Sequence, residues 1–248
     1  MGSIDKFQCG CIDANGLERV RYFPRQLLTA DDMRLEQEYF REKQRRHNRF
    51  LHGWGVVCGL IVQPNPMAGP LAITICAGFA LGPCGDEIYL GDPKPYDLTP
   101  ITQQLAQPSC ANTGVPAAAL GSGLLAIMIR YVECQTRPVR TLPAGCGCDD
   151  SACEFSRIRD GFEIRAVPTT GDTATTVPPT LCEIVQDIAG KLPAFPSPPA
   201  SDWVQLAVIA LKGATAVTSS MIDNSARRVL FTTTQIQQQV IGSCCNAA

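Results

Sequence analysis

Histidine is nearly missing from this chain, and the common catalytic motifs are missing altogether. The only two histidines, His47 and His52, lie in one stretch that is typical of a helix and its end. A cysteine nucleophile needs a neighbouring base. The only histidines that could act as this base are His47 and His52, so cysteine chemistry with a histidine base would have to lie next to that stretch. The sequence has no P-loop, no G-x-G-x-x-G after a strand, no G-x-S-x-G and no H-E-x-x-H. Asp86 and Glu87 are adjacent carboxylates that would face opposite ways on a strand. We therefore expect no catalysis.

Long apolar runs and an export signal are missing as well. No window approaches the roughly 18 apolar residues of a membrane span, so we expect no direct membrane insertion. The first residues, MGSIDKFQCGC, have neither a basic nor an apolar signal region, which predicts cytoplasmic synthesis without a signal peptide. The net charge is −2 and no nucleic-acid-binding motif is present, so nucleic acid is not an expected partner.

Cysteine, in contrast, is abundant, with thirteen residues. Cys146, Cys148 and Cys153 form the one tight group. Zinc favours C-x2-C pairs repeated at a distance, and that spacing is absent. Disulfides, reduced thiols and a bound metal all remain open, and zinc at these three residues is the one cofactor to consider. Cys58 and Cys76 lie inside apolar runs, where we expect small buried hydrophobic residues.

The longest helical pattern runs from Ala30 to about Leu51 without glycine or proline. Thr29 is a suitable N-cap, and Asp32 three residues later makes a short-armed capping box. Gly53 is a suitable left-handed terminator. The sequence therefore predicts a helix with well-defined ends.

One face of this helix carries a seven-residue repeat of Met33, Phe40 and His47, so we interpret His47 as a packing residue. Basic residues gather in the second half of the helix. They are either a solvated face that complements the helix dipole or a contact surface for an acidic partner. The residues expected to contact other subunits are Met33, Phe40, His47, Arg41, Arg45, Arg46, Arg49 and Trp54.

After residue 55 the pattern changes to short strands bounded by glycine and proline. We expect a mainly β (α+β) fold, an antiparallel β-domain with one long N-terminal helix and long Pro/Gly-rich loops. The strands are expected within 56–90, 123–134, 161–167 and 203–231, with a short helix at 99–106. The predicted organisation is an N-terminal helical segment (1–55), a β-rich domain (56–231) with insertions at 91–122 and 168–201, and a C-terminal arm (232–248).

Three motifs follow one another between Tyr22 and Val62. They are F/Y-x-P-x-x-L-L-T-x-x-D at 22–32, Q-x-Y-F-R-x-K at 37–43 and H-N-R-x-L-H-G-x-G-V-V-x-G-L at 47–60. In this order they resemble a little-characterised family of structural proteins encoded with contractile phage tails and phage-tail-like contractile injection systems. Weaker matches follow at 77–90, 126–139, 153–164, 203–211 and 222–230.

The resemblance implies a structural part of a tail, baseplate or fibre-attachment assembly. Such a subunit would bind other particle subunits and form a homo-oligomer. It would be built into a particle that is released or docked at a membrane. Two alternatives come from the residues themselves. The β-rich organisation and the cysteines also suit a cell-surface or secreted module that binds carbohydrate or a partner, and the 146–153 group suits a metalloprotein.

Overall fold

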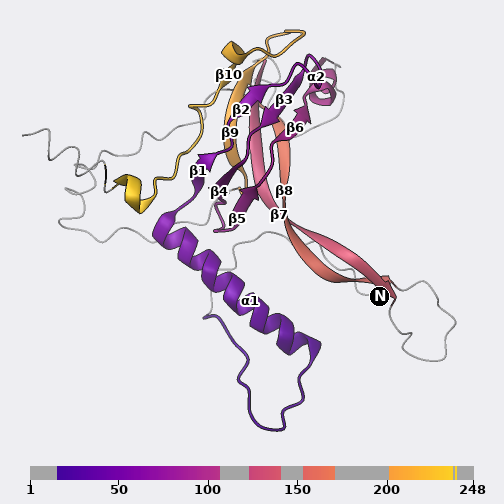
Figure 1. The fold of residues 1–248 in the computed structure, drawn as a ribbon, viewed down its shortest axis with the longest axis vertical. Helices are drawn as coiled ribbons and strands as arrows, with labels where there is room; N and C mark the ends of the chain where they lie inside the picture. Colours follow the sequence, from indigo (N-terminus) through magenta and orange to yellow (C-terminus); the bar gives the residue numbers. More distant parts are fainter. Residues whose placement is uncertain (1–15, 107–122, 141–152, 171–200, 237, 239–248) are drawn as a thin grey trace, which may run out of the picture.

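The computed structural model describes residues 16–106, 123–140, 153–170, 201–236 and 238 (Figure 1). A long helix, α1 (Ala30–His47), continues into a π-helical turn, η1 (Asn48–His52), and leads into three antiparallel sheets. The expected fold class, mainly β with one long N-terminal helix, is confirmed. No helix in this part of the chain has the length and apolar character that a membrane crossing needs.

Two of the sheets are small and the third is large. The first has the order β1-β4-β5 and the second the order β2-β3-β6, whereas the third has the order β10-β9-β7-β8. The strands of the small sheets are β1 (Gly55–Gly59), β2 (Val62–Pro64), β3 (Ala72–Ile75), β4 (Gly78–Leu81), β5 (Glu87–Leu90) and β6 (Lys94–Asp97). Those of the large sheet are β7 (Leu124–Arg140), β8 (Cys153–Thr169), β9 (Val204–Ala210) and β10 (Ile222–Asp223).

All three sheets contribute to one apolar core. Ile75, Ile88, Ile127 and Leu206 are fully buried in it and come from the three different sheets. The alternation of side chains along each strand explains this arrangement, because every second residue faces the core. Burial of each such side chain stabilises the fold by about 1.5–3 kcal/mol. The core is therefore what joins the sheets.

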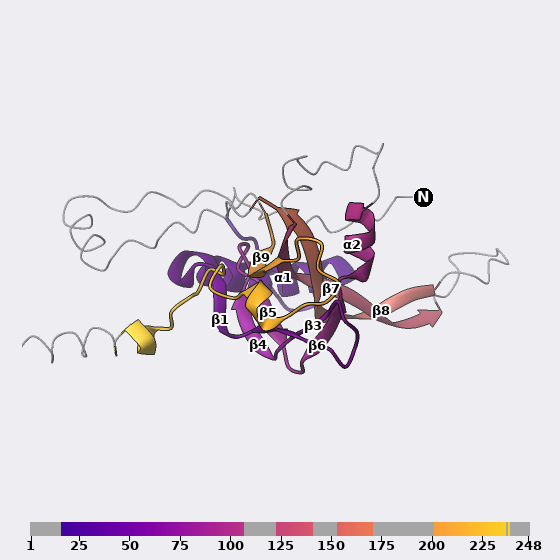
Figure 2. The ribbon, with the colours of Figure 1, turned by 90° about the horizontal axis from the view of Figure 1, so that it is seen from above.

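The largest strands extend beyond the core. β7 and β8 each have 17 residues and pair along their whole length, whereas β9 pairs only with residues 124–129 of β7. The far ends of β7 and β8 continue as a two-stranded ribbon that points away from the sheets (Figure 2). We call residues 135–139 and 154–158 the ribbon.

One local prediction is confirmed, because helix α2 (Thr99–Ala106) occupies the expected residues. The apolar run 71–81 is divided into β3 and β4 just before Gly78, and a hairpin turn follows at 83–85. β6 was not expected inside 91–122, because Pro95 argues against a strand. Proline is tolerated there because β6 is an edge strand. Residues 107–122 of that insertion, residues 171–200 of the next one and most of the C-terminal arm lie outside the described residues.

Two expectations are wrong. Cys58 is exposed, because the pairing of β1 with β4 shifts register between Val56 and Cys58, and Cys76 is only half-buried. Strands were expected within 203–231, but after β9 this range holds only the two-residue β10 and a single bridge between Val56 and Val229. The Asp223 carboxylate accepts hydrogen bonds from the backbone and side chain of Ser225, which turns the chain away from the sheet.

Candidate interaction surface

Helix α1 begins and ends as its sequence predicts, with one difference. The Thr29 hydroxyl accepts a hydrogen bond from the Asp32 N–H at 3.1 Å, and the Asp32 carboxylate accepts one from the Thr29 N–H at 2.8 Å. These hydrogen bonds lower the pKa of Asp32, with the side-chain bond from Thr29 as the larger cause. Gly53 has φ +80°, as expected, but ψ −148° places it outside the left-handed helical region, in a conformation almost restricted to glycine.

Helix α1 is attached to the sheets by polar side chains in its second half. Arg41 pairs with Glu133 of β7 at 2.5 Å. Arg45 pairs with Asp86, at the start of β5, also at 2.5 Å. Asn48, which is buried, donates a hydrogen bond to the carbonyl of Gly85 at 2.9 Å. Such bonds have defined directions, so they fix the orientation of the helix.

At this attachment, burial and nearby charges shift the pKa values of the paired side chains in opposite directions. Burial raises the pKa of Asp86, and the nearby Arg45 guanidinium offsets part of that effect. Burial alone would lower the pKa of Arg45, but Asp86 and Glu42 outweigh it and raise the value. Burial also raises the pKa of Tyr131, whose hydroxyl donates to Asp160 at 2.6 Å. We conclude that Arg41, Arg45, Asp86 and Glu133 form a structural ion-pair network, although Arg41 Nε and Glu133 Oε2 are buried without a hydrogen-bond partner.

A face of α1 that lies next to the attached one is turned toward solvent. We call Met33, Gln37, Phe40, Gln44 and His47 the outer stripe; all five are exposed, and none of the 18 residues of α1 is buried. Phe40 is 59% exposed and Met33 is 48% exposed. The helix therefore holds the sheets with its charged side and leaves its apolar repeat uncovered.

The expectation that His47 is a packing residue is wrong for this chain. His47 is exposed, and its ring meets the ring of His52 edge-on with centroids 5.4 Å apart. The reason is rotational, because Arg41, Arg45 and Asn48 occupy the side of the helix that faces the sheets. His47 instead belongs to the uncovered surface.

The remaining predicted contact residues are distributed around this end of the helix. Arg46 is exposed. The Arg49 guanidinium lies 4.7 Å from the Phe50 ring centre, and the half-buried Trp54 lies under Arg228 at 4.4 Å. Thus Arg41 and Arg45 already have acidic partners in this chain, and a role of all eight residues in contacts with other subunits stays a prediction.

The segment before α1 adds further uncovered apolar surface, which the sequence reasoning did not single out. Tyr22, Phe23, Leu27 and Leu28 are all exposed, and Leu27 is 84% exposed. The signal was present in the first motif, whose L-L pair directly precedes the N-cap. Together with the outer stripe, these residues make a continuous stretch of sequence with little burial.

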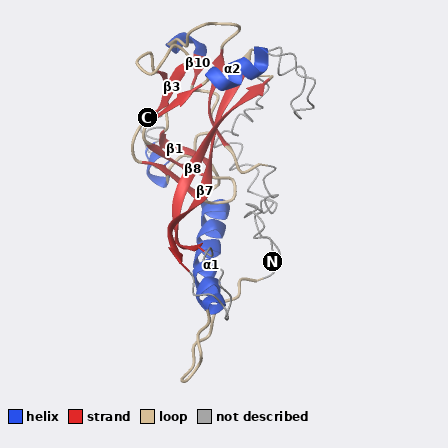
Figure 3. Ribbon diagram, turned by 90° about the vertical axis from the view of Figure 1, so that its right-hand side faces the viewer, coloured by secondary structure: helices blue, strands red, loops and turns tan. Residues whose placement is uncertain are grey.

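The ribbon is a second uncovered apolar element. Val139, Phe155 and Ile158 are exposed on it, and Phe155 pairs with Pro138 across the two strands. A two-stranded ribbon has only marginal stability by itself. The ribbon extends beyond the core, as does the first half of α1, which also runs away from the sheets (Figure 3).

The proposed zinc site lies mainly outside the described residues. Cys153 begins β8 as an exposed free thiol, whereas Cys146 and Cys148 are not in the described part of the chain. Across the residues that are described, no three acidic, histidine or cysteine side chains gather closely enough to hold a metal ion. Cys84 takes part in a disulfide. The zinc prediction is left untested.

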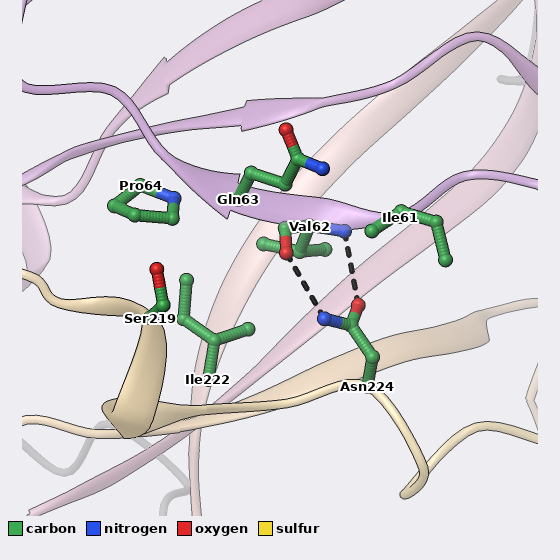
Figure 4. Close-up of a pocket in the computed structure, with 7 residues that line it drawn as sticks. All are labelled: Ile61, Val62, Gln63, Pro64, Ser219, Ile222 and Asn224. Carbon is green, nitrogen blue, oxygen red and sulfur yellow. Dashed lines mark hydrogen bonds between the residues drawn. The ribbon is translucent and has the colours of Figure 1, made fainter.

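A groove of about 420 Å³ lies between the edge strands β2 and β10 (Figure 4). The Asn224 side chain crosses it, donating to the Val62 carbonyl and accepting from the Val62 N–H, both at 3.0 Å. Arg227 is buried behind it, donates to the Gly59 carbonyl at 3.0 Å, and has its pKa lowered by burial. The Asn224 side chain and the Val62 backbone therefore bind one another and join two sheets.

No family model and no curated protein matches this chain. Among solved structures, it is similar to a chain of the type VI secretion system TssK-TssF-TssG baseplate subcomplex, with 11% identity and a TM-score of 0.39 over 81% of this chain and 59% of that one. It is also similar to the crystal structure of TssK, with 11% identity and a TM-score of 0.39 over 84% of this chain and 41% of that one. The chain thus spans less than two thirds of either structure. The similarity is distant.

Proposed function

We propose that this protein is a structural subunit of a phage-tail-like contractile injection particle and that it acts by binding other subunits. One observation carries the proposal. Helix α1 is held to the sheets by its charged side, while its outer stripe is exposed along the whole helix. Most helices in proteins gain their stability by packing an apolar face. The outer stripe is therefore expected to be covered by another subunit.

The motifs and the uncovered surface coincide, which supports this assignment. The first motif contains the exposed Leu27 and Leu28, the second contains Phe40, and the third begins at His47. The first two motifs thus fall on positions that this chain leaves largely uncovered, and the third starts there before it enters the core at Val56 and Leu60. A sequence pattern that served only the fold of the isolated chain would be expected on buried positions instead.

The proposed place of the subunit is the tail, baseplate or fibre-attachment region. The chain is proposed to be made in the cytoplasm and then built into the particle, which is released or docked at a membrane. The attachment of α1 by directional ion pairs suits such a role, because a subunit must present its contact surface in a fixed orientation.

Particle purification tests the proposal. The tagged chain is produced from its own gene, particles are sedimented through a density gradient, and each fraction is analysed by mass spectrometry. We expect the chain to co-sediment with sheath and tube proteins and Phe40→Asp to remain in the soluble fraction. Met67→Asp is the matched control, because Met67 is 95% exposed on a different surface. Recovery of the unmodified chain only in the soluble fraction would refute the proposal.

A further inference from the structure

We propose that the outer stripe of α1 pairs with the outer stripe of a second copy of this chain, with the two helices antiparallel. The inference rests on the proposed function and deepens it, because it names the partner of that surface. The observations that carry it are the spacing of the stripe, the distribution of charge along α1 and the way in which α1 is held.

The spacing of the outer stripe is that of a coiled coil. Its residues are separated by four, three, four and three positions, an average of 3.5. A repeat of 3.5 keeps an exposed seam facing another helix over several turns. Gln37 and Gln44 alternate with Met33, Phe40 and His47, and polar residues at such positions weaken a coiled coil while restricting its register. The partner that this surface fits is therefore another helix.

The distribution of charge along α1 makes the helix complementary to a second, antiparallel copy of itself. Residues 30–40 contain four acidic residues and one basic residue, whereas residues 41–49 contain five basic residues and one acidic residue. Two antiparallel copies place each acidic half beside a basic half, and their helix dipoles also oppose one another. Two parallel copies would place like charges together. A second copy of the same helix is thus an electrostatically matched partner only in the antiparallel orientation.

One pair of flanking residues specifies the register. Glu36 precedes Gln37 and Lys43 precedes Gln44, so both lie on the same side of the outer stripe. In an antiparallel pair, residues at this position face each other, and Glu36 of each copy then meets Lys43 of the other. Lys43 is exposed and Glu36 is half-buried. The pairing would form two symmetrical ion pairs.

The residues that flank the outer stripe on its other side argue against a parallel arrangement of the two helices. In a parallel pair, Glu36 and Lys43 would face the positions of Arg41 and Asn48 in the second copy. Both of these side chains already bind their own sheets, Arg41 through Glu133 and Asn48 through the Gly85 carbonyl. Within the described residues, the hydrogen bonds that join α1 to the sheets come from its second half. Antiparallel helices would therefore carry the two sets of sheets at opposite ends.

Reversal of the two flanking charges tests the pairing in the purified full-length chain. Sedimentation equilibrium over a concentration series is expected to show a dimer. Glu36→Lys and Lys43→Glu are each expected to raise the dissociation constant on the order of tenfold, because each change replaces two attractions with two repulsions. The double variant is expected to restore the original value. Glu87→Lys and Lys94→Glu, which are exposed on β5 and β6, are controls with the same changes in charge.

Two features keep this test specific. Glu36→Lys also removes a hydrogen bond between Glu36 and the Tyr22 hydroxyl. Because Lys43→Glu cannot restore that hydrogen bond, recovery of the dimer in the double variant must come from the ion pair between the two copies. Phe40→Asp should abolish the dimer while circular dichroism confirms that the exposed substitution leaves the fold intact. A monomer at all concentrations, a dimer that Phe40→Asp leaves unchanged, or a loss without rescue would overturn the pairing. If the test overturns the pairing but the unmodified chain still co-sediments with particles, the proposed function stands. If the chain forms the dimer but is absent from particles, the pairing stands and the proposed function fails.

Discussion

At the scale of single residues, Gly85 decides how closely α1 approaches the sheets. Its φ is +91°, and a Cβ there would lie 2.1 Å from the carbonyl oxygen of Arg45. Its own carbonyl accepts the hydrogen bond from Asn48. Any side chain at this position would push the helix away and remove that bond at the same time. The attachment of α1 therefore requires glycine at this position for two separate reasons.

Gly85→Ala should lower the free energy of unfolding by about 2–5 kcal/mol, which combines the cost of a left-handed backbone with that of an overpacked contact. Gly213→Ala is the matched control, because Gly213 has φ +78° and nothing within 4 Å of its would-be Cβ. The control should lose only the backbone part, about 1–2 kcal/mol. Equal losses in urea denaturation would show that the close approach to Arg45 is unimportant.

The capping carboxylate of Asp32 should give α1 a dependence on pH. Its pKa lies below the ordinary value of 3.8, so the carboxylate stabilises the folded helix above that value. That contribution is lost as the pH falls through the lowered pKa, and the first turn should then fray. Thr29→Ala should return the pKa of Asp32 toward 3.8, as measured by NMR titration. Asp97, whose pKa is lowered by Thr99, should not respond, and an equal change at both residues would contradict the cap assignment.

At the scale of elements, the local sequence predicted where the helices begin and end, but it did not predict which residues they contact. The N-cap at Thr29 and the bounds of α2 depend on neighbouring residues, and both were predicted correctly. The inner face of α1 was not foreseen, because the partners of Arg41 and Arg45 lie 92 and 41 residues away in the sequence. An apolar repeat normally predicts the buried side of a helix. Here distant carboxylates select the side of the helix next to the repeat, and the repeat is left for contacts outside the chain.

The Arg45–Asp86 pair should contribute strongly to stability because both side chains are mostly buried. Asp86→Ala leaves the Arg45 charge without this partner and should cost about 3 kcal/mol in the free energy of unfolding. The double variant Arg45→Met/Asp86→Leu should recover part of the loss. Asp31→Ala is the control, because it breaks the exposed Arg34–Asp31 pair and should cost less than about 1 kcal/mol. Similar losses for the two single variants would mean that burial adds nothing to the inner pair.

At the scale of the whole molecule, stability and contact surface lie in different places. The apolar core joins the three sheets, while the outer stripe and the ribbon extend from it with exposed apolar side chains. The sequence predicted the strands of the core from short runs bounded by glycine and proline. It could not predict the sheet order or the length of the ribbon, because pairing between β7 and β8 depends on contacts between distant residues.

This separation predicts that apolar side chains on the two extensions can be replaced without unfolding the protein. Phe40→Asp in the outer stripe and Phe155→Ser in the ribbon should each change the free energy of unfolding by no more than about 0.5 kcal/mol, because both side chains are at least half exposed. Ile127→Ala should lower it by about 2–5 kcal/mol, since Ile127 is fully buried. Urea denaturation at a single low protein concentration compares the three variants without a contribution from association. A loss for Phe40→Asp as large as that for Ile127→Ala would mean that α1 packs its apolar side within the chain.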